Sequence, residues 1–260
     1  MLNHNEVTIG GIITKKYVPD SKRFIRLFVE VPKFGLDRES GQGQTVILKV
    51  DVQGDNMALL ENAQAADPAK DRKGDFFFCK GQLIPIPVTP DGWDKPFAIP
   101  WIAADTTRPV VVIPEGQRYA GPSFNEIVMV GFCAEKDDLK EVGANKRKLI
   151  NFKIVWNPRK EKDEADEAFN KRKVWMRCTA WGGTAENWVD RYLNKGDTTL
   201  VRGRLSYKSD NLKVKEKPLE QIAIDIDDVQ FETPVKKGGG SSGKKPAGPS
   251  AAGYDEDLPF

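Results

Sequence analysis

The segments KGDFFFCKGQL (residues 73–83) and KGDTTLVRGRL (195–205) are two versions of one motif, and they decide the fold. A second motif precedes each of them, since NEV (5–7) followed by Gly11 recurs as NEI (125–127) followed by Gly131. The offset is 122 residues from 73 to 195 and 120 residues from 5 to 125. Matches in the same order and at nearly the same spacing predict a duplicated domain.

Each copy contains mostly β-branched or alternating runs of strand length. In the second copy these runs predict strands at 126–134, 148–156, 173–181, 198–208 and 222–232. A helix is expected between the third and fourth strands, with Thr184 as its N-cap, Gly196 as its stop, and an apolar face of Ala185, Trp188, Val189, Tyr192 and Leu193. Three strands, a helix and two more strands is the order of a five-stranded OB barrel. The first copy follows it with strands at 6–14, 24–31, 45–52, 76–84 and within 97–113, and with a weaker helix around 56–64.

The predicted fold class is therefore all-β with one short helix per domain, as two tandem five-stranded OB-fold barrels and a disordered C-terminal tail. The predicted divisions are a first, divergent OB-fold domain (1–117), a linker (118–123) where Gly and Pro interrupt the pattern, a second OB-fold domain (124–232), a flexible linker (233–254) and an acidic tip (255–260). Residues 233–253 are rich in Gly, Ser, Pro and Lys, so they have too little apolar surface to offset the cost of ordering.

The overall composition is that of an ordinary globular protein. Lys and Arg number 40 against 38 acidic residues, so any basic surface must be local. Cys79, Cys133 and Cys178 fall in apolar strand-like runs, which indicates buried thiols. With His4 as the one histidine, neither a metal nor another cofactor is expected. The sequence has no apolar run of membrane-spanning length and no signal-peptide pattern at its N-terminus, so we expect a reduced cytoplasmic protein.

Residues 174–181, VWMRCTAW, predict a strand with two different faces. Alternate residues of a strand point to opposite sides, which separates an apolar row (Val174, Met176, Cys178, Ala180) from an outward row (Trp175, Arg177, Thr179, Trp181). Bases stack on aromatic rings for about 1–3 kcal/mol each, and basic side chains follow the phosphates. The outward row predicts a binding track for single-stranded nucleic acid; the alternative is that a loop or a subunit interface covers the tryptophans.

The first copy has a different version of this face. In the strand at 24–31, Phe24 and Phe28 bracket Arg26. The third strand carries no tryptophan and its outward row is Thr45, Ile47, Lys49 and Asp51, which indicates a weaker or differently routed site. Trp93 lies in the turn-rich segment 89–96, where it either stacks on a base or plugs a hairpin.

Residues 157–173 form a charged excursion between two predicted strands. They carry Arg159, Lys160 and Lys162 at one end, Lys171, Arg172 and Lys173 at the other, and acidic residues between them. A hairpin would bring the basic ends together beside the tryptophans and leave the acidic tip distant. We expect the basic ends to contact phosphates; a solvated charged loop is the alternative.

The second copy resembles the bacterial-type single-stranded-DNA-binding proteins (SSB). The resemblance is carried by Asn125, Gly131, LINFKIV (149–155), WMRCTAWGGTAE (175–186), YLNKGD (192–197), VRGRL (201–205) and the terminal DEDLPF. In that family a third-strand tryptophan and an aromatic residue six positions later stack on DNA, at positions that match Trp175 and Trp181. The family's strand-2 tryptophan does not align cleanly with Trp156, and its hairpin tryptophan has no counterpart near Asp210.

The resemblance implies a further set of properties. The family assembles four barrels, and this chain is similar to the tandem form of the Deinococcus–Thermus group, which implies a homodimer with four OB folds. The candidate residues for single-stranded DNA are Trp175, Arg177, Trp181, Lys153, Trp156, Lys173 and Arg202 in the second copy, and Phe24, Arg26, Phe28 and Trp93 in the first.

The C-terminal tip is predicted to recruit partner proteins. Leu258 and Phe260 offer two apolar anchors, and Asp255, Glu256, Asp257 and the terminal carboxylate suit a pocket rimmed by Lys or Arg, with Pro259 between the anchors. An acidic solubilising tail is the alternative, but it does not account for two large apolar residues at the end of the tether.

The predicted function is a non-catalytic, nucleoid-associated protein. It would coat single-stranded DNA with little sequence preference in replication, recombination and repair, and recruit the enzymes of these processes through its tip. The alternative is an OB-fold adaptor of a replication complex whose faces bind proteins. An enzyme is not expected, because the carboxylates are not clustered and His4 offers no triad.

Overall fold

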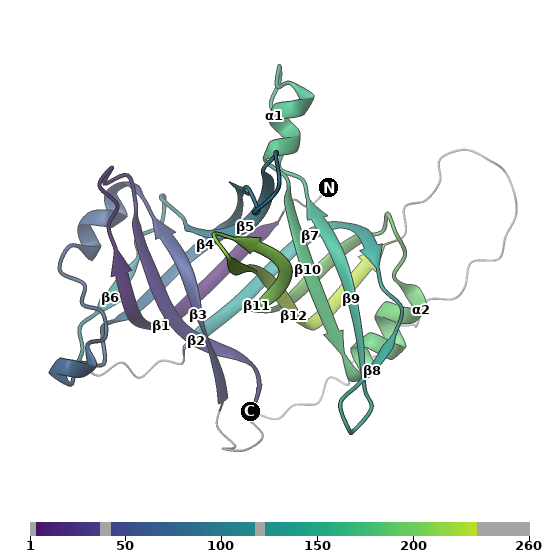
Figure 1. The fold of residues 1–260 in the computed structure, drawn as a ribbon, viewed down its shortest axis with the longest axis horizontal. Coiled ribbons are helices and arrows are strands. Elements are labelled where there is room, and N and C mark those ends of the chain that lie inside the picture. Colours follow the sequence, from purple (N-terminus) through teal and green to yellow (C-terminus); the bar gives the residue numbers. More distant parts are fainter. Residues whose placement is uncertain (1–3, 37–42, 118–122, 233–260) are drawn as a thin grey trace, which may run out of the picture.

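The computed structural model describes residues 4–36, 43–117 and 123–232, and it confirms two tandem OB barrels (Figure 1). The first comprises β1 (Asn5–Tyr17), β2 (Ile25–Leu36), β3 (Gly43–Val52), the 3-10 helices η1 (Gly54–Leu60) and η2 (Pro68–Lys70), β4 (Phe76–Val88), β5 (Phe97–Ala104) and β6 (Val111–Ile113). The second comprises β7 (Phe124–Lys136), β8 (Lys140–Val142), β9 (Arg147–Trp156), α1 (Asp166–Lys171), β10 (Val174–Trp181), the π-helix η3 (Thr184–Val189), α2 (Asp190–Tyr192), β11 (Thr198–Val214) and β12 (Lys217–Glu232).

Each barrel closes with the same strand pairing. In the first, β1 pairs with β2 and β4, β2 with β3, β4 with β5, and β3 with β5 in parallel. In the second, β7 pairs with β9 and β11, β9 with β10, β11 with β12, and β10 with β12 in parallel. The antiparallel pairing of β1 with β7, from Asn5 opposite Met129 to Gly10 opposite Phe124, joins the two barrels into one sheet.

The repeated asparagines occupy equivalent places in the two barrels. The Asn5 side chain donates to the Leu83 carbonyl oxygen at 2.8 Å and accepts from the Leu83 N–H at 3.1 Å. Asn125 makes the same pair of bonds to Leu205, both at 2.9 Å. Each amide thus links the first strand of its barrel to the fourth, which explains why the two sequence motifs recur together.

The repeated glycines have a steric cause. A Cβ atom on Gly203 would lie 2.2 Å from the carbonyl oxygen of Asp225, and one on Gly81 would lie 2.3 Å from that of Ala103. Only glycine lets the fourth strand approach the fifth this closely.

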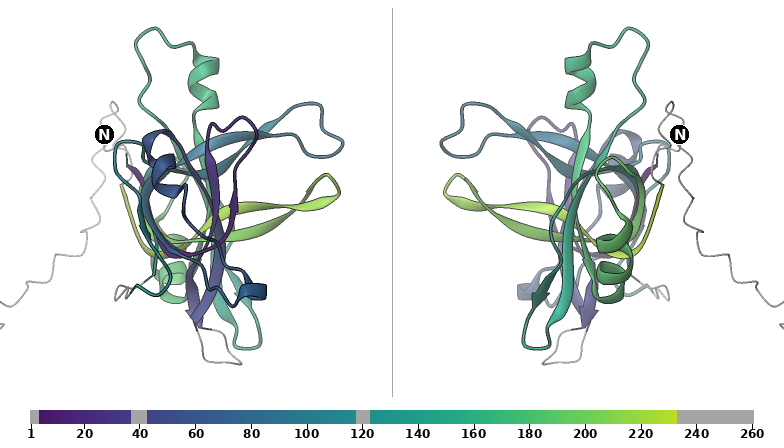
Figure 2. Two further views of the ribbon diagram at one scale, coloured as in Figure 1. Left: turned by 90° about the vertical axis from the view of Figure 1, so that its left-hand side faces the viewer. Right: turned by 90° about the vertical axis from the view of Figure 1, so that its right-hand side faces the viewer.

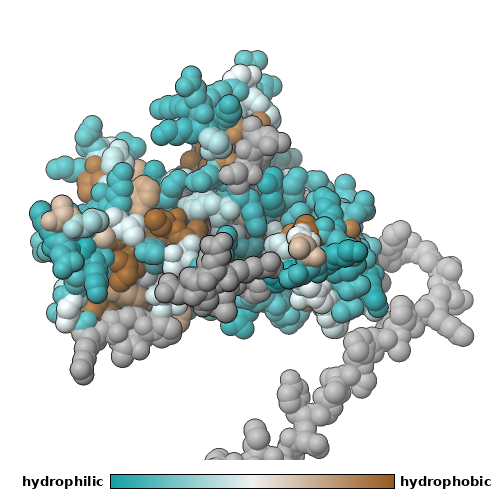
Figure 3. All heavy atoms as spheres, turned by 60° about the horizontal axis from the view of Figure 1, so that its bottom comes forward, coloured by the Kyte–Doolittle hydropathy of each residue, from teal (hydrophilic) through white to brown (hydrophobic). Residues whose placement is uncertain are grey.

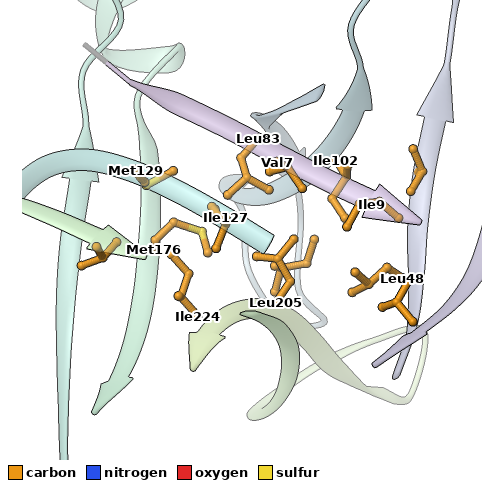
Figure 4. Close-up of a cluster of buried hydrophobic side chains, with 14 of the residues drawn as sticks. Val7, Ile9, Leu48, Leu83, Ile102, Ile127, Met129, Met176, Leu205 and Ile224 are labelled. Carbon is orange, nitrogen blue, oxygen red and sulfur yellow. The ribbon is translucent and has the colours of Figure 1, made fainter. Parts of the chain in front are cut away.

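The apolar rows fill a core that continues from one barrel into the other. Val174, Met176, Cys178 and Ala180 of β10 are buried, as are the three cysteines, and burial raises the pKa of the Cys79 thiol to about 12. Val7 of β1 and Ile127 of β7 lie opposite each other where the two interiors meet (Figure 4). Because the cores are contiguous, the barrels are held together by apolar packing as well as by the sheet.

The helical segments differ in part from the prediction. In the second barrel Ala185, Val189 and Leu193 are buried, but Trp188 and Tyr192 of the expected apolar face are 50% and 53% exposed. Gly183, and not Thr184, precedes the helix, and no side chain caps it. The π-helical first turn changes the angle between successive side chains, which explains why the 3.6-residue period fails here. The helices η2 and α1 were not expected.

Two hairpins and the α1 segment project from the barrels. The β11–β12 hairpin extends to Val214 and Lys217, beyond its predicted ends, and it points to the same side of the molecule as the β4–β5 hairpin (Figure 2). Seen from below the view of Figure 1, the surface is mainly hydrophilic, with hydrophobic residues gathered on the side of the first barrel (Figure 3). The predicted linker falls largely outside the described residues, so the domain boundaries stay predictions.

Candidate nucleic-acid interface

Three of the four residues in the predicted outward row of β10 lie outside the core, and Thr179 is the exception. Trp175 is 49% exposed, and Arg177 and Trp181 are half-buried. Thr179 is buried, and its hydroxyl donates to the side-chain oxygen of Asn151 at 3.0 Å. The strand therefore presents two indoles and a guanidinium on one side, with a fixed polar pair between them.

The neighbouring strand β9 extends this face. Its Lys153 lies opposite Arg177 in register and is paired with Glu135 at 2.9 Å. Arg147, near the start of β9, stacks over Trp181 with its guanidinium carbon 4.7 Å from the ring centroid. One face of Trp181 is thus taken by a cation from within the protein, a contact that the sequence analysis missed.

A cavity of 630 Å³ lies between the two barrels beside Trp175. It is lined by Lys153, Lys173, Trp175, Met176 and Arg177 of the second barrel, by Glu167, Asn170 and Lys171 of the α1 segment, and by residues of both hairpins (Phe97, Ala98, Leu212, Gln221). A second cavity of 370 Å³ is lined by Arg177, Lys153, Thr179 and Lys208, among others. Arg177 and Lys153 line both, so basic groups connect the two hollows along the face.

The charged excursion is folded back on itself, and one part of the prediction is wrong. Its two basic ends do meet, because Arg172 donates to the backbone oxygen of Arg159 at 3.0 Å. The acidic part is not distant, however, since Glu164 accepts from Arg172 at 2.8 and 2.6 Å, and this pairing holds the pKa of Glu164 below its usual range. Opposite charges within the segment attract each other, which fixes α1 above the cavity and leaves Lys173 stacked 5.0 Å from the Phe169 ring.

In the first barrel, the predicted face is closed by internal contacts. Arg26 pairs with the buried carboxylate of Asp51 at 2.7 and 2.9 Å. Its guanidinium also lies 5.0 Å from the Phe24 ring centroid and 4.4 Å from that of Trp101, a β5 residue that the sequence analysis missed. The Phe28 ring carries the ammonium of Lys15 at 5.5 Å. The guanidinium of Arg26 is therefore engaged in contacts within the first barrel.

The second barrel covers part of this cluster. The hydroxyl of Tyr207, on β11, accepts from the backbone N–H of Lys49 at 3.3 Å, and the Lys49 ammonium lies 5.5 Å from its ring. Burial raises the pKa of Tyr207 to about 12. The first-barrel face thus serves as a contact between barrels.

Three other candidates lie in different surroundings. Trp93 is 49% exposed in the β4–β5 loop, where its ring lies 5.8 Å from that of Phe97 in the wall of the larger cavity. Trp156 packs against the core with its indole nitrogen buried, which favours a structural role. Arg202 is paired with Glu126 at 2.6 Å on the sheet shared by the barrels, and it lines neither cavity.

Comparison with known proteins finds a family match for the second barrel. Residues 124–232 match the single-strand binding protein family. This match confirms the resemblance that the sequence motifs of the second copy indicate. No curated protein matches the chain. The crystal structure of the wild-type single-stranded DNA binding protein from Thermus aquaticus is similar in fold, with a TM-score of 0.61 at 16% identity over 91% of this chain and 97% of that chain. A deletion mutant of the same protein gives a TM-score of 0.60 at 18% identity over 89% and 96%.

The sequence also led us to expect no metal site, no membrane-spanning segment and a partner-binding tip at the C-terminus. Among the described residues there is no group of three or more His, Cys, Asp or Glu side chains that could hold a metal ion. None of the described helices is long and apolar enough to cross a membrane. The predicted partner-binding residues, Asp255, Glu256, Asp257, Leu258, Pro259 and Phe260, lie outside the described residues.

Proposed function

We propose that this chain binds single-stranded DNA with little sequence preference and has no catalytic activity of its own. The observation that carries the proposal is the open row of β10, where the half-exposed Trp175 borders a cavity lined by Lys153, Lys173 and Arg177. Bases would stack on the indole, and the cations would follow the backbone. Stacking of this kind is tolerant of sequence, because every base has a π face.

The wider role rests on the family match and on the C-terminal sequence. We place the protein in DNA replication, recombination and repair in the cytoplasm, with its acidic tip (255–260) recruiting partner enzymes of these processes and with two chains forming a homodimer of four barrels. The second barrel is the main DNA-binding unit, because the corresponding face of the first barrel is occupied by the Arg26–Asp51 pair and by Tyr207.

A titration of the intrinsic tryptophan fluorescence with oligo-dT tests this function. We expect quenching, and an affinity that falls steeply as the salt concentration rises, because phosphate contacts release counterions. Mass measurement of the complex counts the chains and the strands. If oligo-dT does not quench the fluorescence and no binding is measured at low salt, single-stranded DNA binding is excluded.

A protein-binding adaptor is the second candidate, and one surface favours it. Trp188 and Tyr192 are half-exposed with their ring centroids 6.2 Å apart, and a cavity of 420 Å³ next to them is lined by Trp188, Val229 and Phe231. Exposed aromatic pairs beside a hollow are typical of protein contacts. Loss of a protein partner, with no change in DNA affinity, on replacement of Trp188 would support this function.

A further inference from the structure

The tips of the two hairpins meet at one carboxylate. Asp91, in the β4–β5 loop of the first barrel, accepts hydrogen bonds from the backbone N–H groups of Lys215 at 2.9 Å and Glu216 at 2.8 Å in the β11–β12 turn of the second barrel. The backbone N–H of Asp91 donates to the carbonyl oxygen of Lys213 at 2.8 Å. Three hydrogen bonds therefore join loops that are about half the chain apart in sequence.

The β11–β12 turn is unfavourable on its own. Lys215 and Glu216 take φ angles of 51° and 65°. A two-residue hairpin turn with positive φ at both positions favours Asn and Gly, because most other residues are strained there. The sequence supplies Lys and Glu instead, and the carboxylate of Asp91 binds both N–H groups of the turn. The stabilisation that the turn residues do not provide thus comes from the other barrel.

The first-barrel loop is shaped to present Asp91. The next residue, Gly92, takes a φ of 78°, and the N–H of Trp93 donates to the carbonyl oxygen of Pro90 at 3.1 Å. This turn places Asp91 at the tip of its loop, as Lys215 and Glu216 are at the tip of theirs. The contact is therefore made between two tips.

The joined hairpins are also walls of the cavity beside Trp175. Phe97 and Ala98 belong to one hairpin, and Leu212 and Gln221 belong to the other. Figure 2 shows both hairpins extending on the same side of the molecule. A strand of DNA that stacks on Trp175 would pass between these walls.

We propose that Asp91 is a positioning residue that fastens the two hairpins to each other and holds the walls of the inter-barrel cavity in place for single-stranded DNA. This proposal rests on the proposed function. Without Asp91 the tips move independently, and DNA must order them when it binds. Ordering one side chain at an interface weakens binding by about 2- to 10-fold.

The test compares Asp91→Ala with Asp94→Ala. Asp94 is an exposed carboxylate in the same loop, and among the described residues it makes no bond to the second barrel, so it controls for the lost charge. In the protein without DNA, we expect faster amide hydrogen exchange at Lys215 and Glu216 in Asp91→Ala alone. Affinity for oligo-dT longer than about 16 nucleotides, the upper site size of one barrel, should fall by about 2- to 10-fold in Asp91→Ala alone.

A second variant separates fastening from local turn formation. Lys215→Asn with Glu216→Gly supplies a turn that favours positive φ without help. If Asp91→Ala still weakens binding in this background, the link between the tips is what matters, and the proposal stands. Full recovery of affinity would overturn it, and so would unchanged exchange or unchanged affinity in Asp91→Ala. If the wild-type protein does not bind oligo-dT, the proposed function fails, and the exchange measurement still decides whether Asp91 fastens the hairpins.

Discussion

Replacing Trp175 by alanine is expected to weaken the binding of oligo-dT by about 5- to 150-fold. The side chain is 49% exposed beside the inter-barrel cavity, so its ring is available to a base. One base–aromatic stack contributes about 1–3 kcal/mol, and each 1.4 kcal/mol is a factor of ten in affinity. Trp181→Ala should fall in the same range, because its half-buried indole lies in the same outward row of β10 as Trp175.

The fold should survive the Trp175 substitution. The neighbours Val174 and Met176 are buried and carry the packing of β10, whereas the indole lies on the outside. Thermal denaturation should show a small change in Tm. The loss of affinity can then be assigned to the missing stack and not to unfolding.

The assay is fluorescence anisotropy of labelled oligo-dT at one fixed salt concentration. Trp188→Ala is the matched control, since Trp188 is 50% exposed on η3 and lines neither cavity beside β10. We expect wild-type affinity in this control, and partial retention of affinity in Trp175→Phe, which keeps an aromatic face. Wild-type binding by folded Trp175→Ala, or an equal loss in Trp188→Ala, would refute the stacking assignment.

Three further predictions concern the first barrel, pH and the tail. Arg26→Ala should lower the free energy of unfolding by about 1–3 kcal/mol, because it leaves the Asp51 side chain, which is 6% exposed, without its ion-pair partner. Calorimetry measures this change, and an unchanged Tm would contradict it. The hydrogen bond from Lys80 lowers the pKa of Glu6 below 4.5 in the folded protein, so the ionised Glu6 contributes its full stabilisation above pH 4.5 and loses it as the pH falls through the folded-state pKa. Glu6→Gln should therefore flatten the acid limb of a Tm–pH profile. A parallel shift of the whole curve would argue against this role of Glu6. Deleting residues 255–260 should leave affinity for oligo-dT unchanged or slightly higher and abolish capture of partner enzymes, with Leu258→Ser and Phe260→Ser as a charge-preserving comparison; unchanged capture would disprove recruitment by the tip.

The fold was predictable because the repeated Asn and Gly residues make or permit specific contacts with the backbone of neighbouring strands. Asn125 clamps Leu205, and Gly203 makes room for the carbonyl of Asp225. Such positions tolerate few substitutions, so they recur in both copies and reveal the duplication. The α1 segment was missed for the opposite reason, because ion pairs such as Arg172 with Glu164 join the residues on either side of its helix, and a pattern of apolar residues does not show them.

The geometry of the candidate site was predictable only where one strand determines it. The period of two residues along β10 separates Trp175 from the core without knowledge of any other element. Arg147, Trp101 and Tyr207 take their places through contacts between strands or barrels, which the sequence spacing does not contain. Arg147 had one usable signal, since it lies two residues before Leu149, which pairs with Trp181 once the β9–β10 register is known.

The two barrels have diverged in what they do with similar residues. A cation beside aromatic rings can bind an external strand only while its ring faces and hydrogen-bond donors stay accessible. In the first barrel the guanidinium of Arg26 is paired with both carboxylate oxygens of Asp51 and lies over two aromatic rings. Tyr207 of the second barrel contacts the same face. On β10 Trp175 remains half-exposed above a cavity. These contacts are why the proposed function assigns the DNA surface to the second barrel and a supporting role to the first.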